Sequence, residues 1–391
     1  MPTTALATPD SPRPHADLVE DAWLDVLDTL PDNLDEMARE EFGFHRRGQI
    51  QTGADVLRLC MAYGVLDLSL RSTAAWLASR RLGDISDVAV LGRLRRSWPF
   101  LGRLLGKMLE PRLRFEPAPR LKYRVRVIDA TCLSAPGAEG AEWRVHATYD
   151  VARGVVDRVE LTDEKGGEQL GRASAGPGEI LVADRGYAHA SRVAEVREAG
   201  GHVLVRVGHS AVPLVDAAGA ELDPLAYARR KRPRAGRPRR VESTTGFLRD
   251  DAAREFPVRL VVVRKTAEAT RLARKKATKE SRKKGKKPRQ RTLDAAAFVF
   301  LLTTLPREEA DDVTVAELYR VRWQVELAFK RWKSIFDLDR LRAFDPDLAR
   351  AYILAKLIAA TIADTLARQA RAFSPWGVRL APLHMAHPRA G

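Results

Sequence analysis

The stretch Lys122-Tyr-Arg-Val-Arg-Val-Ile-Asp-Ala130 marks the point where the chain changes from a helical to a strand pattern. Tyr123, Val125 and Val127 recur at every second position, and Asp129 continues the series. A period of two residues places all four on one face of a β-strand. The stretch therefore predicts a strand that carries a carboxylate near its carboxyl end.

Further strands and helices are predicted downstream of this strand. A glycine in the short connection Ala152-Arg153-Gly154 favours a hairpin between the next two strands. The fourth strand ends, like the first, on an aspartate, Asp184. The predicted elements are strands Trp143–Asp150 and Val155–Leu161, a short helix opening at Glu168–Arg172, strand Glu179–Asp184, helix Ala190–Ala199 and strand His202–Val207.

The segment 208–307 interrupts this alternation and holds most of the excess positive charge. The net charge is +16, yet residues 229–240 carry eight Lys or Arg, and residues 264–291 carry fourteen against two acids. Such local basicity is typical of a surface that binds a polyanion, although a solvated charge run would have the same composition. Strand patterns near 241–247, 257–264 and 297–304, with no helix expected outside the basic tract, predict a β-rich insertion.

Upstream of Lys122 the chain reads as helices from about residue 17 to 115, after a proline-containing N-terminus at 1–16 that we expect to be loose. Ser72–Arg81 and Ser86–Arg96 form two short helical patterns, the second with Ser86 as a predicted N-cap. This pair predicts either a helix-turn-helix that binds DNA or an ordinary helical hairpin with a charged end. The charged end consists of Arg93, Arg95 and Arg96.

The stretch from Tyr319 to Lys333 reads as one amphipathic helix. Tyr319, Arg322, Glu326 and Lys333 are spaced by three, four and seven residues, so at roughly 100° per residue they lie within roughly 60° of arc. A carboxylate between two cations and a phenol is suited to metal-assisted work on a phosphate backbone. Taken alone, Arg322 and Glu326 could also be a surface ion pair worth a few tenths of a kcal/mol.

Other functional classes are disfavoured by composition. Two cysteines make neither a disulfide framework nor a zinc site. The N-terminus is acidic, unlike a secretory signal or a transit peptide. The longest apolar stretch, around Ile353–Leu366, contains Lys356 and Asp364, so we expect a core or interface helix and no membrane span.

The predicted order of elements is that of an α/β, ribonuclease H-like (retroviral-integrase-like) catalytic domain. Asp129 and Asp184 would be neighbours if their strands pair, and Glu326 on a helix packed against the sheet could join them. Three carboxylates of this kind suit two Mg²⁺ ions at roughly 3.5–4 Å separation. The predicted domains are a loose N-terminus at 1–16, an all-α domain at 17–115 for DNA binding, the first part of the catalytic domain at 116–207, a β-rich basic insertion at 208–307, a closing helix at 308–345 and a C-terminal helical segment at 346–391.

Three motifs make the chain resemble the DDE-type transposases of bacterial insertion sequences, in the family with a Tyr-x2-Arg-x3-Glu-x6-Lys signature. Val127-Ile-Asp-Ala-Thr131 is similar to the first acidic strand of that family, and Ile180-Leu-Val-Ala-Asp-Arg-Gly-Tyr-Ala188 to its second acidic motif. The signature helix is matched in full between Tyr319 and Lys333. The resemblance covers roughly residues 120–345.

The resemblance implies that Asp129, Asp184 and Glu326 are catalytic and bind two Mg²⁺ ions, for which Mn²⁺ can substitute. It implies that Tyr319, Arg322 and Lys333 hold phosphates at the transposon end, together with the insertion. The implied activity is excision of an insertion sequence and strand transfer. The implied partners are the terminal inverted repeats, target DNA and a second copy of the chain in a synaptic homodimer, in the bacterial cytoplasm at the nucleoid.

One departure concerns the base that the family flips out of the duplex. Well-studied members use a tryptophan of the insertion, but none lies between residues 208 and 307 here. Phe247, Phe298, Phe300 or Trp323 could stack on the base instead, which leaves the excision route open. Two other functions also stay open: a ribonuclease H-like nuclease that joins no strands, and a catalytically dead DNA-binding regulator derived from a transposase.

Overall fold

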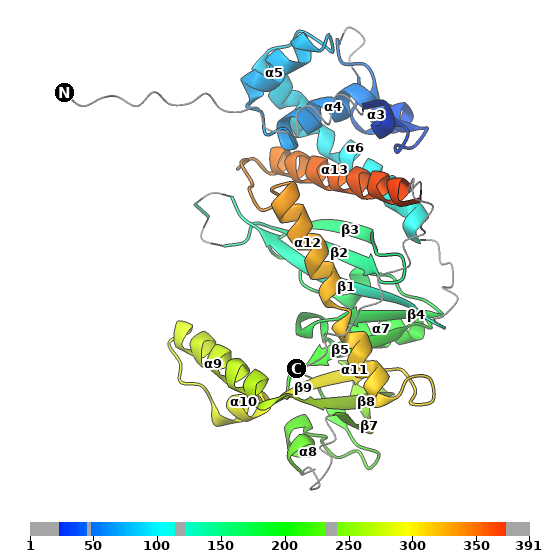
Figure 1. The fold of residues 1–391 in the computed structure, drawn as a ribbon, viewed down its shortest axis with the longest axis vertical. Helices are drawn as coiled ribbons and strands as arrows, with labels where there is room; N and C mark the ends of the chain where they lie inside the picture. Colours follow the sequence, from blue (N-terminus) through cyan, green and yellow to red (C-terminus); the bar gives the residue numbers. More distant parts are fainter. Residues whose placement is uncertain are drawn as a thin grey trace, which may run out of the picture. The chain divides into compact units, whose positions relative to one another are not determined.

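The computed structural model describes residues 23–44, 48–113, 122–135, 137–138, 140–210, 212–230 and 241–372. It is a mixed α/β structure with a large sheet (Figure 1). The chain divides into two compact units: Met1–Pro111 with Ser134–Ala138 and Arg331–Gly391, and Arg112–Leu133 with Glu139–Lys330. The predicted N-terminus at 1–16 and most of the basic run 229–240 lie outside the described residues.

The second unit is built on one nine-stranded sheet with the order β3-β2-β1-β4-β5-β9-β8-β7-β6. β1, β4 and β5 are parallel neighbours, and the other pairs are antiparallel. The strands predicted at Trp143–Asp150 and His202–Val207 are confirmed residue for residue. The strands are β1 Arg124–Leu133, β2 Trp143–Asp150, β3 Val155–Asp163, β4 Glu179–Ala183, β5 His202–Val207, β6 Leu214–Val215, β7 Val241–Arg249, β8 Glu255–Arg264 and β9 Phe298–Thr303.

The segment predicted as an insertion continues the same sheet. β9 pairs antiparallel with β5, so the β-rich part beyond residue 207 is joined to the strands that carry the aspartates. Short helices, absent from our prediction, also occur there: α8 Pro224–Arg230 and α10 Gln290–Ala295. The helix expected in the basic tract is confirmed as α9 Ala267–Lys283.

The helices of the second unit lie on both faces of the sheet. One face packs on α7 Ala190–Glu198 and α8, in a core that includes Leu181, Val205 and Leu260. The helix predicted to open at Glu168–Arg172 is only a 3-10 turn, η1 Leu170–Arg172. α11 Asp312–Arg320 packs on β5, β7 and β8, and α12 Trp323–Ile335 follows it (Figure 1).

β1 is buried on both faces, which its alternating sequence does not indicate. Arg124 bonds to Asp150, Asp157 and Glu179, and Arg126 bonds to Asp157 and to the Ser174 carbonyl oxygen. Buried guanidinium groups need this compensation, because an unpaired charge in the interior costs several kcal/mol. The network holds β1 against β2, β3 and β4 and thereby supports the strand that carries Asp129.

The described part of the first unit is helical. Its elements are α2 Trp23–Leu27, α3 Leu34–Glu41, α4 Gly53–Gly64, α5 Leu70–Ser79, most of α6 Asp87–Leu113 and α13 Pro346–Ala372. The predicted cap is present, since the Ala89 N–H donates to Ser86 Oγ at 3.2 Å. The predicted end at Arg96 is wrong: α6 continues for seventeen further residues, through Pro99 and Pro111. No helix among the described residues is long and apolar enough to cross a membrane.

Candidate active site

Two of the predicted acids come together where the parallel pairing of β1 with β4 ends, although β1 itself continues to Leu133, beyond the strand end that we predicted at Ala130. Ile128 of β1 pairs with Ala183 of β4, and Ala183 pairs with Val205 of β5. One step further along each strand, the register aligns Asp129, Asp184 and Arg206. Their side chains share a face, because residues that lie side by side on neighbouring strands point to the same side of a sheet. The predicted neighbourhood of Asp129 and Asp184 is therefore confirmed.

The predicted single helix from Tyr319 to Lys333 is wrong, because α11 ends at Arg320 and α12 begins at Trp323. Between them, the N–H groups of Val321, Arg322 and Gln324 bond to carbonyls three residues earlier, a tight 3-10-type turn. Tyr319 thus lies at the end of one helix, Arg322 in the turn and Glu326 in the first turn of the next. The shared helical face that we expected for four residues therefore applies only to Glu326 and Lys333, which both lie in α12.

The turn nevertheless delivers the predicted residues to the strand ends. Arg322 bridges two of the acids, with Nη1 3.2 Å from Asp129 Oδ2 and Nη2 2.6 Å from Glu326 Oε1. The Tyr319 hydroxyl donates to Asp184 Oδ1 at 3.1 Å. The Arg322–Glu326 contact is therefore part of a larger cluster, and the simpler interpretation as an isolated surface ion pair is wrong.

Arg206 is a site residue that our sequence reasoning missed. Its Nη1 lies 3.7 Å from Asp184 Oδ1. In the row across the three strands, Asp184 stands between Asp129 and Arg206. The available signal was a single cation in the otherwise apolar strand His202–Val207, at the end nearest the predicted site. The Arg206 side chain is partly exposed, and its partner is a carboxylate of the site.

The two aspartates differ in their protonation. Burial, with the nearby charges of Glu326 and Asp184, raises the pKa of Asp129 to about 6, although the Ala130 N–H and Arg322 oppose the rise. Burial also acts to raise the pKa of Asp184, but the Arg185 N–H, Arg206, Arg322 and the Tyr319 hydroxyl outweigh it and lower the pKa. Negative charge at Asp129 is therefore the less compensated of the two.

These shifts predict opposite effects of removing each charge. A carboxyl with a raised folded-state pKa binds more protons folded than unfolded, so its contribution to stability falls as pH rises from about 4 to 6. Asp129→Asn should therefore stabilise the metal-free protein above pH 6, by on the order of 1 kcal/mol, with little gain near pH 4. Urea unfolding in EDTA at pH 4.5 and 7.5 measures this difference.

Asp184→Asn is the matched control for that experiment. Its lowered pKa means that the ionised carboxylate favours the folded state above the unfolded-state pKa, so this variant should be less stable than the parent at pH 7.5. The difference should shrink as pH falls. A destabilised Asp129→Asn protein at pH 7.5, or equal shifts at both pH values, would contradict the assignment.

The other predicted residues belong to the first unit, whereas the cluster belongs to the second. Lys333 is seven residues beyond Glu326 in α12, which carries it about 10 Å along the helix on nearly the same face. In α6, Arg93 bonds to the Ala89 carbonyl, Arg96 stacks on Phe42, and Arg95 pairs with Asp345. All three arginines thus have contacts within their own unit.

The aromatic residues that could stack on a flipped base differ in how far they are buried. Phe298 and Phe300 of β9 are core residues, 7% and 4% exposed, so the expectation that either could stack on a base is wrong in this conformation. Phe247 is partly buried. Trp323 is 48% exposed at the start of α12, directly after Arg322.

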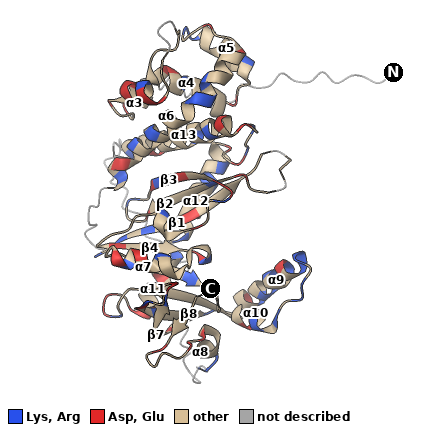
Figure 2. Ribbon diagram, turned by 180° about the vertical axis from the view of Figure 1, so that it is seen from behind, with Lys and Arg blue, Asp and Glu red and all other residues tan. Residues whose placement is uncertain are grey.

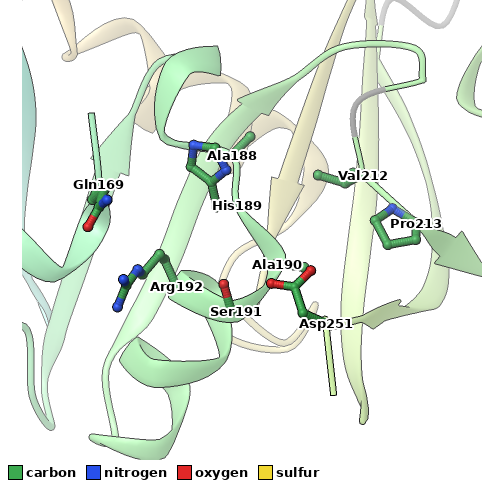
Figure 3. Close-up of a pocket in the computed structure, with 9 residues that line it drawn as sticks. All are labelled: Gln169, Ala188, His189, Ala190, Ser191, Arg192, Val212, Pro213 and Asp251. Atoms are coloured by element: carbon green, nitrogen blue, oxygen red, sulfur yellow. The ribbon is translucent and has the colours of Figure 1, made fainter. Parts of the chain in front are cut away.

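A cavity of about 340 Å³ lies at the amino end of α7. Figure 3 shows His189 and Ser191 at its wall across from Val212, Pro213 and Asp251, with Arg192 on the side of Gln169. None of the residues predicted from sequence lines it. The cavity therefore adds no group to the cluster at the strand ends.

The arrangement at the strand ends has the donor chemistry for a hard cation. Asp129, Asp184 and Glu326 offer carboxylate oxygens, the ligands that Mg²⁺ prefers. In the described residues, however, no three His, Cys, Asp or Glu side chains are close enough together to hold a metal ion. The Arg322 guanidinium stands between Asp129 and Glu326 and keeps them apart.

Comparison with known proteins gives the family. A transposase from insertion sequence element IS421 of Escherichia coli is 36% identical over 362 residues, which cover 91% of this chain and 96% of the relative. A transposase from element IS231F of Bacillus thuringiensis subsp. israelensis is 34% identical over 101 residues, 26% of this chain and 21% of the relative. A cryo-EM structure of a piggyBac transposase synaptic complex with hairpin DNA aligns with a TM-score of 0.44 and 9% identity, over 89% of this chain and 73% of that one.

The match to a family extends over the whole of the described site. The family described as the transposase DDE domain matches residues 120–362, which include both aspartates, the turn at Arg322 and α12. The chain therefore belongs to the transposase DDE domain family, and it is a DNA transposase related to those of bacterial insertion sequences.

Proposed function

We propose that this transposase excises an insertion sequence and joins it to target DNA by Mg²⁺-dependent phosphoryl transfer at Asp129, Asp184 and Glu326. The observation that carries the proposal is the alignment of Asp129 with Asp184 directly after the parallel pairing of β1 with β4, with Glu326 linked to Asp129 through Arg322. In this reading the strands β1 to β5, with α7, α11 and α12, are a ribonuclease H-like domain. The segment 208–307 is its insertion, and the helical segment 17–115 is an N-terminal DNA-binding domain.

Asp129, Asp184 and Glu326 would hold two Mg²⁺ ions, with Mn²⁺ as a substitute, after Arg322 moves and lets the carboxylates approach one another. The site has three carboxylates, and burial leaves the charge of Asp129 poorly compensated, so a divalent cation is favoured there. When bound, the ions would lower the pKa of an attacking water or 3′-hydroxyl and stabilise the departing oxygen. Arg322 would exchange its two carboxylates for a DNA phosphate, which it can grip in the same bidentate way.

The other cations of the site are suited to holding the transposon end. Tyr319 and Arg206 contact Asp184, and the further N–H groups of the Arg206 guanidinium would be available to a phosphate there. Lys333, further along α12, makes no ion pair with any residue in the described ranges and is available for the next phosphate. We propose that Trp323 stacks on the flipped base, because its ring is exposed and it directly follows Arg322 in the chain.

The basic arm α9 provides a longer surface for DNA. It contains no buried residue, and Figure 2 shows Lys and Arg along it. Its half-covered positions are small or polar, for example Ala269, Ala273 and Ala277, while every Lys and Arg of the helix is exposed. Such a helix is stabilised little by core packing and is suited to follow a phosphate backbone.

We also propose the remaining partners. Arg93, Arg95 and Arg96 in α6 would contact the terminal inverted repeats, and two copies of the chain would hold two transposon ends in a homodimer. Action on a bacterial chromosome would take place in the cytoplasm at the nucleoid.

A strand-transfer assay with pre-cut transposon ends tests the proposal. The protein, the ends and a supercoiled target plasmid are incubated with Mg²⁺, and we expect products in which a 3′-hydroxyl of the end is joined to the target. Cleavage of uncut ends without joining would favour the nuclease. A gel shift with neither reaction in Mg²⁺ or Mn²⁺ would favour the inactive regulator.

A further inference from the structure

The Arg322 guanidinium occupies the space between two carboxylates of the proposed metal site. Its Nη1 lies 3.2 Å from Asp129 Oδ2, and its Nη2 lies 2.6 Å from Glu326 Oε1. Two carboxylate oxygens that bind the same Mg²⁺ ion lie at most about 4 Å apart, because each lies about 2.1 Å from the ion. A guanidinium that contacts one acid with each terminal nitrogen therefore excludes an ion from that space.

The separation of the acids concerns Glu326 above all. In the part of the chain that the structure describes, no three His, Cys, Asp or Glu side chains lie close enough together to hold a metal ion. Asp129 and Asp184 are set side by side by the pairing of their strands, whereas Glu326 belongs to α12. The third ligand is thus the one that Arg322 holds at a distance from the other two.

The contacts of Arg322 can be exchanged for others. The Arg322 and Asp129 side chains are 18% exposed and the Glu326 side chain is 41% exposed, so water and ligands can reach the bridge. Arg322 lies in the turn between α11 and α12 and is not held inside either helix. A DNA phosphate offers a guanidinium two oxygens in a bidentate arrangement, so two charge-assisted hydrogen bonds replace the two that are lost.

Arg206, the other cation that contacts an acid of the cluster, is placed differently. Its Nη1 lies 3.7 Å from one carboxylate, that of Asp184, and its side chain is 41% exposed. In the row across the strands it stands at the end, with Asp184 between it and Asp129. Arg206 therefore adds positive charge beside the acids without filling the space between them.

We propose that Arg322 is a lock on the metal site, which stays closed to divalent cations until a DNA phosphate takes the guanidinium from Asp129 and Glu326. DNA and the cation both favour the conformation in which Arg322 has left the acids, so each strengthens the binding of the other. The lock rests on the proposed function, since it concerns these acids as metal ligands. It adds an order to that function: where the cation is too dilute to displace Arg322 by itself, the transposon end binds first.

Arg322→Gln tests the lock in the absence of DNA, because it removes the guanidinium from between the acids. The dissociation constant for Mn²⁺, measured by electron paramagnetic resonance, should fall about 5- to 150-fold relative to the parent protein. Arg206→Gln is the matched control, since it removes the same charge from beside Asp184 and opens no space. Its affinity for Mn²⁺ should rise much less. Equal gains in the two variants would overturn the lock, because loss of any nearby positive charge would then suffice.

The coupling is also measurable in the parent protein, without any substitution. A labelled, pre-cut transposon end that lacks its 3′-hydroxyl can be neither cleaved nor joined. Fluorescence anisotropy at constant ionic strength should show that this end binds more tightly in Mn²⁺ than in EDTA, by about 5- to 150-fold. A protein with amides in place of all three acids records the effect of Mn²⁺ on the DNA itself, which is subtracted. In Arg322→Gln the gain should shrink, because the lock is already open.

Two kinds of failure can be told apart. If the parent protein without DNA binds Mn²⁺ as tightly as Arg322→Gln does, and binds ends equally in Mn²⁺ and EDTA, the metal site stands and the lock is overturned. A gain from Mn²⁺ that is as large in Arg322→Gln as in the parent has the same consequence. If neither protein binds Mn²⁺, with or without ends, the proposed metal site itself is refuted.

Discussion

Asp129→Asn, Asp184→Asn and Glu326→Gln proteins are each expected to lose at least about 10³-fold in the rate of strand cleavage. A metal ion contributes several kcal/mol of charge stabilisation in the transition state, and each 1.4 kcal/mol corresponds to a factor of about ten in rate. Binding of transposon ends should be retained or strengthened, because each change removes a negative charge facing a phosphate. Cleavage kinetics on end-bearing duplex DNA, with gel shifts in parallel, measure both effects.

Glu255→Gln is the control for this series. Glu255 of β8 pairs with Arg249 at the surface and belongs to no part of the cluster, so cleavage should remain at the parent rate. Robust Mg²⁺-dependent cleavage by the Glu326→Gln protein would refute the assignment of Glu326. Loss of DNA binding together with cleavage would instead indicate that the carboxylates support the DNA surface.

A protein with four exposed cations of α9 replaced by glutamine should bind DNA with a much weaker salt dependence. Arg271, Lys275, Lys279 and Arg282 fall within roughly 80° of arc on the helix and are exposed. Each lost phosphate contact reduces the slope of log K against log salt by about 0.9, so four contacts reduce it by about 3.6. The affinity at ~0.1 M salt should fall by on the order of 10³-fold. Folding stability should change little, since exposed side chains contribute little.

Two further sets of variants test whether the change in salt dependence comes from the charges of α9. Exchanging Lys and Arg at the same four positions keeps the charge and should keep the slope. Lys333→Ala should reduce the slope by about one, whereas Arg331→Ala, on the opposite side of α12, should leave it unchanged. A quadruple variant with the parent slope would exclude α9 from the DNA surface.

Much of the site could be predicted because local patterns specify it. The strand period around Asp129 places that residue on a strand, and the apolar run before Asp184 places Asp184 at a strand end, without reference to the rest of the chain. The motifs around Tyr319, Arg322 and Glu326 identify the third carboxylate and its cation. Local patterns also misled us, since no residue between Tyr319 and Lys333 is a helix breaker, and yet the helix is interrupted at Arg322.

The interruption is a product of tertiary contacts. Arg322 bonds to Asp129, which lies 193 residues earlier, and Tyr319 bonds to Asp184, which lies 135 residues earlier. A helix that continued from α11 into α12 would present these side chains along a straight face. The tight turn lets both meet a row of residues set by the sheet.

The sequence by itself determined which residue types meet and the strands on which the two aspartates lie, because periodicity and spacing are local properties. Only the tertiary structure decided the register that aligns Asp129, Asp184 and Arg206, since pairing joins strands distant in the chain. It also decided the position of Arg322 between Asp129 and Glu326 and the burial of Phe298 and Phe300. Burial depends on what packs against a side chain, and those neighbours come from other parts of the chain.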